Sequence, residues 1–220
     1  MEETAKQYTF EDSLKSIETE NLLDRIFYRP IGYRIALLLA KTPVTPNTIT
    51  IISIFIGVFA GVLLSPQNIW INIAGFALLV IANILDCVDG QLARLTGIKS
   101  PIGRILDGLA GNLWFISIYI AIALRLSADF GAAVAWTAAT LSGLSNLIQS
   151  NIVDYYKTAH LYFISSAKGS EFETVSSIKA KHSAMPRGIN KALYVLYVYY
   201  STIQMFITPQ LQKLLARLTA

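Results

Sequence analysis

The sequence predicts an all-α protein: a polytopic integral membrane bundle of five to six transmembrane helices, preceded by an amphipathic interfacial helix. Hydrophobic residues make up 54% of the chain and charged residues only 15%, against roughly 25% charged in a soluble domain. Several uninterrupted apolar runs also reach the length needed to cross a bilayer. A soluble domain of 220 residues does not need such runs, so they decide the class of protein.

Five apolar runs carry the prediction of membrane helices. They cover residues 49–64, 69–85, 105–124, 130–153 and 192–207. The second ends directly on Asp86, and the third is apolar except for Asp107. The fourth is rich in small residues, as tightly packed membrane helices are, and the fifth is rich in tyrosine, which suits a membrane interface as well as a span. A sixth span is either hidden near residues 161–164 or absent.

The distribution of basic residues predicts the orientation of the chain. With the N-terminus in the cytoplasm, all of the 18 basic residues except Arg125, Lys213 and Arg217 fall on the cytoplasmic side, as the positive-inside rule requires. The net charge of +4 is therefore attributed to topology and not to nucleic-acid binding, because the basic residues flank membrane spans. We expect a multi-pass membrane protein whose N-terminus and functional site face the cytoplasm.

Residues 1–44 are expected to form a cytoplasmic segment ahead of a membrane domain at residues 45–220. The first part of this segment is acidic and has no early apolar stretch, which argues against a cleaved signal peptide. Leu22, Leu23, Ile26 and Phe27 recur at helical spacing, which predicts an amphipathic helix lying on the membrane surface. Pro30 is expected to interrupt that helix.

The candidate functional residues lie where the second span ends and the third begins. If the second span stays helical beyond residue 85, four of them share one face at helical spacing. They are Asp86, Asp89, Gly90 and Ala93. Asp107 projects from the early turns of the next span, which begins with Ser100 as N-cap and Pro101 in the first turn. The three aspartates are therefore expected to lie close together, at about one membrane depth.

Three carboxylates with no basic partner inside either span are energetically costly. One acid at the centre of a membrane helix costs about 2.5–3.5 kcal/mol, and like charges cost more unless one is protonated or a cation joins them. Mg²⁺ or Mn²⁺, hard cations with oxygen ligands, would neutralise the cluster. Gly90 and Ala93 leave room for a ligand, and Arg94 offers a planar fork of donors to phosphate. The pattern indicates a phosphoryl-transfer site; the alternative is a set of acids that merely face water.

This stretch resembles the CDP-alcohol phosphotransferase family, whose signature is D-x2-D-G-x2-A-R-x8-G-x3-D-x3-D. The residues in register with it are Asp86, Asp89, Gly90, Ala93, Arg94, Gly103 and Asp107. The similarity extends upstream to residues 45–50, which look like the family's P-N-x-x-T start of its first membrane helix. The same residues are equally typical of an ordinary helix start, with Thr45 as cap and Pro46 in the first turn.

The resemblance implies a reaction and roles for the residues. Such enzymes cleave the pyrophosphate of a CDP-linked alcohol, often CDP-diacylglycerol, transfer the phosphatidyl or substituted phosphoryl group to an alcohol acceptor and release CMP. By the family's pattern, Asp86, Asp89 and Asp107 are the catalytic residues and hold Mg²⁺ or Mn²⁺. The residues implied for the CDP moiety are Asn47, Thr50, Gly90, Ala93, Arg94 and Gly103.

The partners implied are the CDP-linked donor, the alcohol acceptor and membrane lipids, with no nucleic acid. Gly57 and Gly61 form a small-residue stripe in the first span. That spacing favours packing between helices of one chain and leaves a homodimer contact open. A further set of residues on the cytoplasmic side serves topology and lipid headgroups or recognises an acceptor phosphate. It comprises Lys157, His160, Lys168, Lys179, Lys181, His182 and Arg187.

One position departs from the signature. Where a fourth aspartate is expected the chain has Gly111, followed by Asn112. The resemblance implies that this aspartate completes a second metal site and acts as general base. Neither glycine nor an amide takes a proton at neutral pH. Three explanations stay open: another group activates the acceptor, the chain binds a CDP-alcohol with little turnover, or the acceptor chemistry differs.

Three functions are therefore compared. The first is a transferase of phospholipid biosynthesis, and the second is a non-catalytic family member that binds a CDP-alcohol and metal. The third is an ion-coupled transporter that uses the same acids. A transporter more often has inverted repeats and broken helices, and neither is evident in the sequence.

Overall fold

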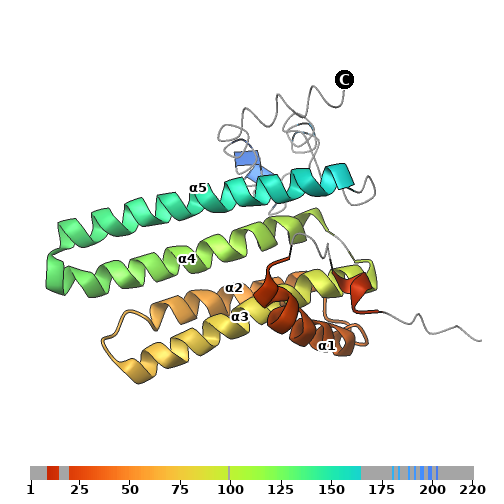
Figure 1. Cartoon of the computed structure of the whole chain (residues 1–220), viewed down its shortest axis with the longest axis horizontal. Helices are drawn as coiled ribbons and strands as arrows, with labels where there is room; N and C mark the ends of the chain where they lie inside the picture. The colour runs from red at the N-terminus through yellow and green to blue at the C-terminus, as the bar shows by residue number, and fades with distance from the viewer. Residues whose placement is uncertain are drawn as a thin grey trace, which may run out of the picture. The chain divides into compact units, whose positions relative to one another are not determined.

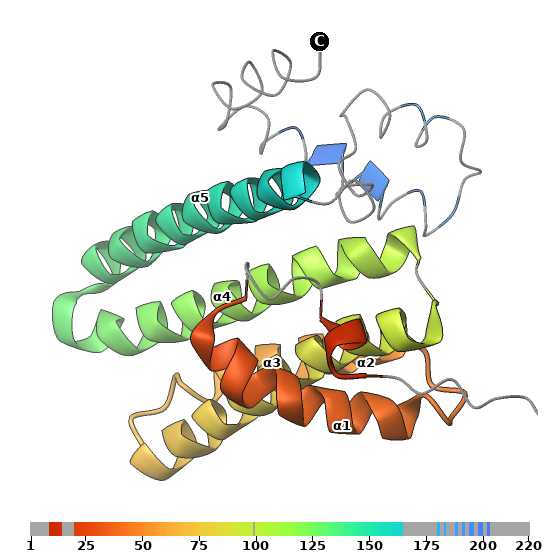
Figure 2. The same cartoon turned by 45° about the vertical axis from the view of Figure 1, so that its right-hand side comes forward.

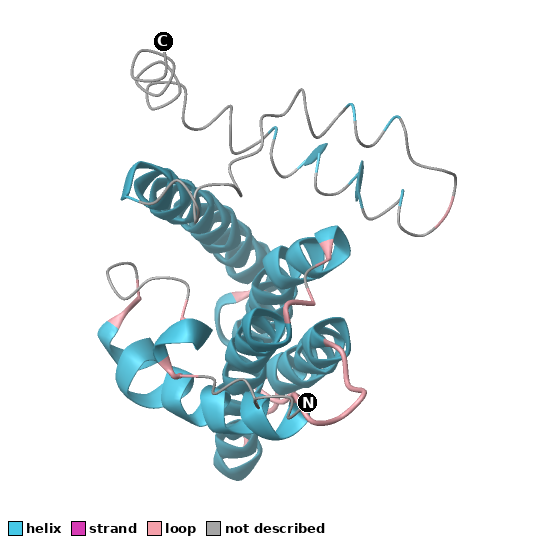
Figure 3. Ribbon diagram, turned by 90° about the vertical axis from the view of Figure 1, so that its right-hand side faces the viewer, coloured by secondary structure: helices cyan, strands magenta, loops and turns pink. Residues whose placement is uncertain are grey.

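The computed structural model describes residues 9–14, 20–98 and 100–164, together with single positions between 180 and 202. Every element in these residues is helical (Figures 1 and 3), which confirms the predicted all-α class. The elements are a 3-10 turn η1 (Glu11–Ser13), a π-helical segment η2 (Asp24–Tyr28), α1 (Arg29–Leu39), α2 (Pro46–Val62), α3 (Ile69–Thr96), α4 (Pro101–Phe130) and α5 (Ala132–Ile164). The predicted span at residues 192–207 lies mostly outside the described residues.

The chain divides into two compact units, Met1–Thr140 and Leu141–Ala220. The first unit contains α1 to α4 and all the predicted metal-binding and CDP-binding residues. The second contains most of α5. The short extra span considered near residues 161–164 is not a separate element, because these residues form the last turn of α5.

The starts of α2 and α4 follow capping signals in the sequence. The hydroxyl of Thr45 accepts a hydrogen bond from the N–H of Thr48 at 3.3 Å, and Pro46 is in the first turn of α2. The hydroxyl of Ser100 accepts from the N–H of Gly103 at 2.8 Å at the start of α4. Both caps satisfy N–H groups that have no partner within the helix, and both were predicted.

The helix α3 connects the core of the first unit to the candidate site. It stays helical past residue 85 as far as Thr96, as predicted, and ends at Gly97. The φ angle of Gly97 is 74°, a left-handed conformation that favours glycine and stops a helix. The turn at Gly97 leads the chain towards the start of α4, so the two signature-bearing helices follow each other closely in sequence.

Two apolar clusters hold the helices of the first unit together. The C-terminal half of α3 packs against α1 and the start of α2 (Figure 2). The buried residues there are Ala36, Ile49, Val88, Leu92 and Leu95. Further along, Ala82 of α3 and Ala110 and Trp114 of α4 pack with the middle of α2. The central helix α2 therefore contacts both α3 and α4, which positions the two helices that carry the aspartates.

Two glycines of α2 allow α4 to approach closely. A Cβ atom at Gly57 would collide with the ring of Trp114, and one at Gly61 would collide with Ser117. The hydroxyl of Ser117 donates to the carbonyl oxygen of Val58 at 2.7 Å across this contact. The predicted role of the stripe in helix packing is confirmed, and the face considered for a dimer is covered by α4 of the same chain.

The expectation that Pro30 interrupts the N-terminal helix is wrong. Residues 22–39 are continuously helical, because the π-helical segment η2 runs directly into α1. In a regular α-helix the proline ring collides with the carbonyl group four residues back. The wider turn avoids this collision: the N–H of Arg29 donates to the carbonyl oxygen of Asp24, five residues back. The predicted apolar side chains Leu22 and Ile26 are 73% and 67% exposed.

Two of the described helices are long and apolar enough to cross a membrane: α3 and Ile105–Phe130 of α4. The helix α2 is apolar but shorter. Large apolar side chains also lie on the outside of these helices, where Phe55, Trp70 and Phe76 are 72%, 76% and 66% exposed. Such extensive exposed apolar surface is typical of a face that contacts lipid or a partner. The predicted number of five to six spans stays a prediction.

The close contact between α2 and α4 generates a test. In Gly57→Ala the new methyl group meets the ring of Trp114, and overpacking of this kind costs about 1–3 kcal/mol. We expect the variant to unfold several degrees below the wild type when the loss of helical circular dichroism is followed in detergent.

The matched control is Gly108→Ala, another glycine inside a helix, whose added Cβ meets no described atom within 4 Å. Both changes gain the same helix propensity, up to about 1 kcal/mol. An unfolding temperature of Gly57→Ala equal to that of Gly108→Ala would show that α4 does not pack on this stripe.

Candidate active site

The three predicted aspartates come together where α3 ends and α4 begins. One carboxylate oxygen from each of Asp86, Asp89 and Asp107 lies within 4.8 Å of the others. The helical spacing places Asp86 and Asp89 on one face of α3, and an early turn of α4 supplies Asp107. Burial decreases across the cluster: Asp89 is buried, Asp86 is half-buried and Asp107 is exposed. The structure thus brings together the side chains that were predicted to converge.

The donor set fits a hard divalent cation. Carboxylate oxygens are the ligands that Mg²⁺ and Mn²⁺ prefer, and three acids at this spacing repel one another unless a cation or a proton lies between them. The exposure of Asp107 leaves one side of the cluster open to solvent. A cation held here could keep free coordination positions for water or phosphate oxygens.

Thr50 of α2 holds one of the carboxylates in place. Its hydroxyl is hydrogen-bonded to Oδ2 of Asp89 and also lies 3.1 Å from the carbonyl oxygen of Pro46. Thr50 and Asp89 are only 2% and 4% exposed. The resemblance implied that Thr50 contacts the CDP moiety, and this stays a prediction; in the structure its hydroxyl contacts the aspartate. We therefore expect Thr50 to position Asp89.

Asn47 lies between the starts of α2 and α4. The hydroxyl of Ser100 donates a hydrogen bond to Oδ1 of Asn47 at 3.1 Å. A Cβ atom on Gly103 would lie 2.6 Å from the same oxygen. Position 103 therefore has no room for a side chain while Asn47 stays in place, which gives this signature glycine a packing role between the two helices.

Arg94 folds back over Gly90, one turn before it on α3. A Cβ atom on Gly90 would lie 3.2 Å from Nη2 of Arg94, which is tighter than ordinary contact. The glycine thus makes room for the guanidinium group, in addition to any ligand. Nε of Arg94 donates to the carbonyl oxygen of Ser13 in the N-terminal segment, a contact that sequence reasoning missed. Ala93, which precedes Arg94 on α3, is half-buried.

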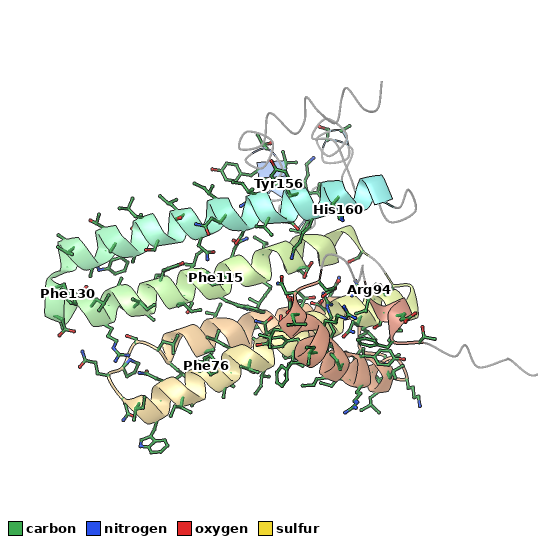
Figure 4. The ribbon with its side chains drawn as sticks, in the orientation of Figure 1. Phe76, Arg94, Phe115, Phe130, Tyr156 and His160 are labelled. Atoms are coloured by element: carbon green, nitrogen blue, oxygen red, sulfur yellow. The ribbon has the colours of Figure 1, made fainter. Side chains whose placement is uncertain are left out.

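Gln91, which the signature leaves unspecified, is also part of this region. Its side chain is fully buried, and Nε2 donates to Oγ of Ser13 and to the carbonyl oxygen of Arg29, each at 3.1 Å. A polar residue between the buried Val88 and Leu92 on an apolar helix was the one signal that could have identified it. Figure 4 shows Arg94 among the side chains of the N-terminal elements, far along α3 from Phe76.

At the position where the signature has its fourth aspartate, the described residues leave space for a side chain. Gly111 lies one turn beyond Asp107 on α4, and a Cβ added there meets no described atom within 4 Å. Asn112 does not take over this space, because its Nδ2 donates to the carbonyl oxygen of Gly108 at 2.8 Å. The amide is therefore bound to the backbone of its own helix.

The basic residues considered for acceptor recognition fall in the second unit. Lys157 is half-buried on α5. His160 is exposed on the same helix (Figure 4). The remaining members of the set lie outside the described residues. They are Lys168, Lys179, Lys181, His182 and Arg187.

The described residues form a helical bundle with two membrane-length helices and a carboxylate cluster where α3 ends and α4 begins. This arrangement defines a class: membrane proteins with an acidic cluster that could hold a divalent cation. Comparison with protein families is more specific. The model of the CDP-alcohol phosphatidyltransferase family matches residues 43–207, and the chain belongs to this family. It is therefore a membrane protein of a family that acts in phospholipid synthesis.

Two curated relatives share this region. An archaetidylinositol phosphate synthase of Pyrococcus horikoshii is 36% identical over 122 residues, which cover 56% of this chain and 58% of the relative. A protein of the same name from Aeropyrum pernix is 32% identical over 103 residues, which cover 44% of this chain and 51% of the relative. The chain thus matches little more than half the length of either protein.

The contact of Thr50 with Asp89 predicts a loss of metal affinity in Thr50→Val. This change keeps the shape of the side chain but removes the hydroxyl group, and losing such a partner of a metal ligand costs about 10- to 100-fold in affinity. Binding of Mn²⁺ to the purified protein, measured by electron paramagnetic resonance, is expected to weaken by about tenfold.

Thr50→Ser keeps the hydroxyl and should keep the affinity. Thr137→Val is the control, because that hydroxyl donates to the carbonyl oxygen of Ala133 on α5, outside the cluster. If Thr50→Val binds Mn²⁺ as tightly as Thr137→Val does, Thr50 does not position Asp89.

Proposed function

We propose that the protein is a membrane-embedded transferase that moves a lipid-bearing phosphoryl group from a CDP-linked lipid to an alcohol acceptor and releases CMP. The observation that carries this proposal is the convergence of Asp86, Asp89 and Asp107 within 4.8 Å, at the positions of the sequence that are in register with the family's signature. Membership in the CDP-alcohol phosphatidyltransferase family supports the type of reaction.

The residues of the site have distinct roles in this proposal. Asp86, Asp89 and Asp107 hold Mg²⁺ or Mn²⁺, which supplies positive charge against the donor's pyrophosphate when it is bound. The guanidinium group of Arg94 donates to phosphate oxygens, and Gly90 leaves it the space to do so. Asn47 and Gly103 hold the starts of α2 and α4 together.

The reaction is a displacement at the phosphorus that bears the lipid. The hydroxyl oxygen of the acceptor forms a bond to this phosphorus, the bond between phosphorus and the bridging oxygen of CMP breaks, and CMP leaves with the electron pair. The proton of the acceptor passes to a base. Asp107 is the exposed carboxylate of the cluster, so it is the one that an acceptor arriving from solvent meets.

The names of the two relatives narrow the set of candidate substrates. Both are archaetidylinositol phosphate synthases, so we infer that the acceptor is an inositol phosphate. The lipid part of the donor is then archaeol, and CDP-diacylglycerol is the alternative that the family resemblance alone favours. The acceptor's phosphate would require a cationic partner.

A second function is favoured by one specific observation. The position expected to carry the general base is Gly111, and the neighbouring Asn112 is hydrogen-bonded to its own helix. A protein with an intact metal and donor site but no such base would bind a CDP-linked lipid without efficient turnover. This non-catalytic role is the alternative that the first experiment must separate.

Release of CMP by the purified protein tests the proposal. With Mg²⁺ or Mn²⁺, CDP-archaeol or CDP-diacylglycerol, and inositol phosphate among a panel of alcohols, wild type is expected to release CMP. Chelation by EDTA, Asp86→Asn or Asp89→Asn should each reduce release to background, because each removes the metal or a ligand. Asp129→Asn, which alters an exposed acid at the other end of α4, should retain wild-type activity.

Gly111→Asp distinguishes the two functions, because loss of a general base typically costs about 10²–10⁴-fold. If wild type releases no CMP and Gly111→Asp does, the binding role is favoured. If neither protein releases CMP and neither binds CDP, the proposed function is contradicted altogether.

We further propose that the N-terminus and the aspartate cluster face the cytoplasm and that residues 22–28 lie on the membrane surface. The positive-inside bias supports the orientation. The exposed apolar side chains of Leu22, Leu23, Ile26 and Phe27 support contact with lipid headgroups and acyl chains.

Single-cysteine labelling tests this orientation. Cys87 is the only cysteine, so Cys87→Ser provides the background for Thr42→Cys, between α1 and α2, and Gln67→Cys, between α2 and α3. Both positions are exposed. In inside-out vesicles an impermeant maleimide should label Thr42→Cys alone, and in right-side-out vesicles Gln67→Cys alone. The reverse pattern would contradict the orientation, and labelling of both from one side would show that α2 does not cross.

A further inference from the structure

Residues 10–14, here called the strap, lie against α3 beside the signature arginine. Within the strap, the hydroxyl of Ser13 donates to the carbonyl oxygen of Phe10 at 2.6 Å. Ser13 is fully buried and Leu14 is 7% exposed. The match to the family begins only at residue 43, so membership in the family assigns no role to this segment.

Contacts on both sides fix the strap to α1. The ring of Phe10 packs edge-on against that of Tyr33, with centroids 5.4 Å apart. Beyond the strap, Oε2 of Glu20 forms an ion pair with Nε of Arg29 at 2.9 Å, and both side chains are largely buried. Buried ion pairs and aromatic contacts of this kind restrict the conformations open to a segment.

The strap contacts the signature arginine directly. The carbonyl oxygen of Ser13 accepts a hydrogen bond from Nε of Arg94, and Oγ of Ser13 accepts one from Nε2 of Gln91 at 3.1 Å. The same nitrogen of Gln91 donates to the carbonyl oxygen of Arg29. One buried amide therefore joins α3, the strap and the start of α1.

The contact at Nε decides where the rest of the guanidinium group lies. A guanidinium is planar and rigid and carries five N–H donors, so a hydrogen bond from Nε also restricts where the terminal nitrogens lie. Those nitrogens lie 3.2 and 3.5 Å from the position that a Cβ of Gly90 would take. An arginine that is ordered before the ligand arrives loses less conformational freedom on binding.

We propose that the strap is part of the donor site, and that Ser13 and Gln91 are positioning residues that orient Arg94 towards the phosphate oxygens of the CDP-linked lipid. This inference rests on the proposed function, in which Arg94 contacts the donor's pyrophosphate. It adds a segment outside the region of family similarity to the residues that determine donor affinity.

Binding of CDP to the full-length protein in Mg²⁺, measured by isothermal titration calorimetry, tests the proposal. Ser13→Ala and Gln91→Leu each remove hydrogen bonds that anchor the strap, and losses of this size weaken binding by about 3- to 10-fold. We expect the Kd for CDP and the KM for the CDP-linked lipid to rise together, with kcat nearly unchanged.

The control for a general loss of stability is Ser117→Ala. It removes a hydroxyl that donates to the carbonyl oxygen of Val58 at 2.7 Å, at a position about 15 Å along α4 from Asp107 at 1.5 Å per residue. It should lower the unfolding temperature and leave the Kd for CDP unchanged.

A double-mutant cycle shows whether the strap acts through the arginine. In an Arg94→Gln background, Ser13→Ala should cause no further loss of CDP affinity, because the group that it positions is absent. An equal loss in both backgrounds would overturn the proposal. So would unchanged CDP affinity in a Ser13→Ala protein with wild-type helical content. If wild type itself binds no CDP, both the proposed function and the proposed role of the strap are contradicted. If wild type binds CDP and the strap variants bind it equally well, only the proposed role of the strap is contradicted.

Discussion

Mutual repulsion among three carboxylates is the constraint around which the first unit is organised. Held within 4.8 Å, Asp86, Asp89 and Asp107 favour separation, so their helices must be fixed by contacts made elsewhere. The apolar clusters on both sides of α3 supply these contacts, and Thr50 restrains Asp89 directly. A cation that binds the folded cluster relieves the repulsion, so binding and folding favour each other.

The signature of the family is in part a packing motif. Gly90 accommodates the guanidinium group of Arg94, and Gly103 accommodates the side chain of Asn47. In both cases the small residue is required by a neighbouring polar side chain of the same protein. The chemistry of the site and the close approach of its helices therefore depend on the same positions, and a substitution there alters both together.

Local patterns in the sequence predicted the features that depend on local physics. The lengths of apolar runs and the caps at Thr45 and Ser100 identified the starts of α2 and α4, and a period of 3.6 residues placed Asp86 and Asp89 on one face. The contact between Ser13 and Arg94 joins residues 81 positions apart, and no periodicity encodes such a pair. The resemblance to the family's P-N-x-x-T pattern assigned Thr50 to the CDP moiety, and its contact with the carboxylate of Asp89 on α3 could not be derived from that pattern.

The wide helical turn before Pro30 allows one helix to have an exposed apolar stripe before the turn and a buried face after it. A widened turn contains one residue more than an α-turn, so the side chains before it are displaced around the axis by about 100° relative to those after it. The apolar stripe at Leu22 and Ile26 is exposed, whereas Gly32 and Ala36 are buried against the bundle. The wide turn at residues 24–28 thus sets the angle around the helix axis between the apolar side chains before Pro30 and the buried residues after it. This angle determines which surface of the protein the N-terminal apolar stripe lies on.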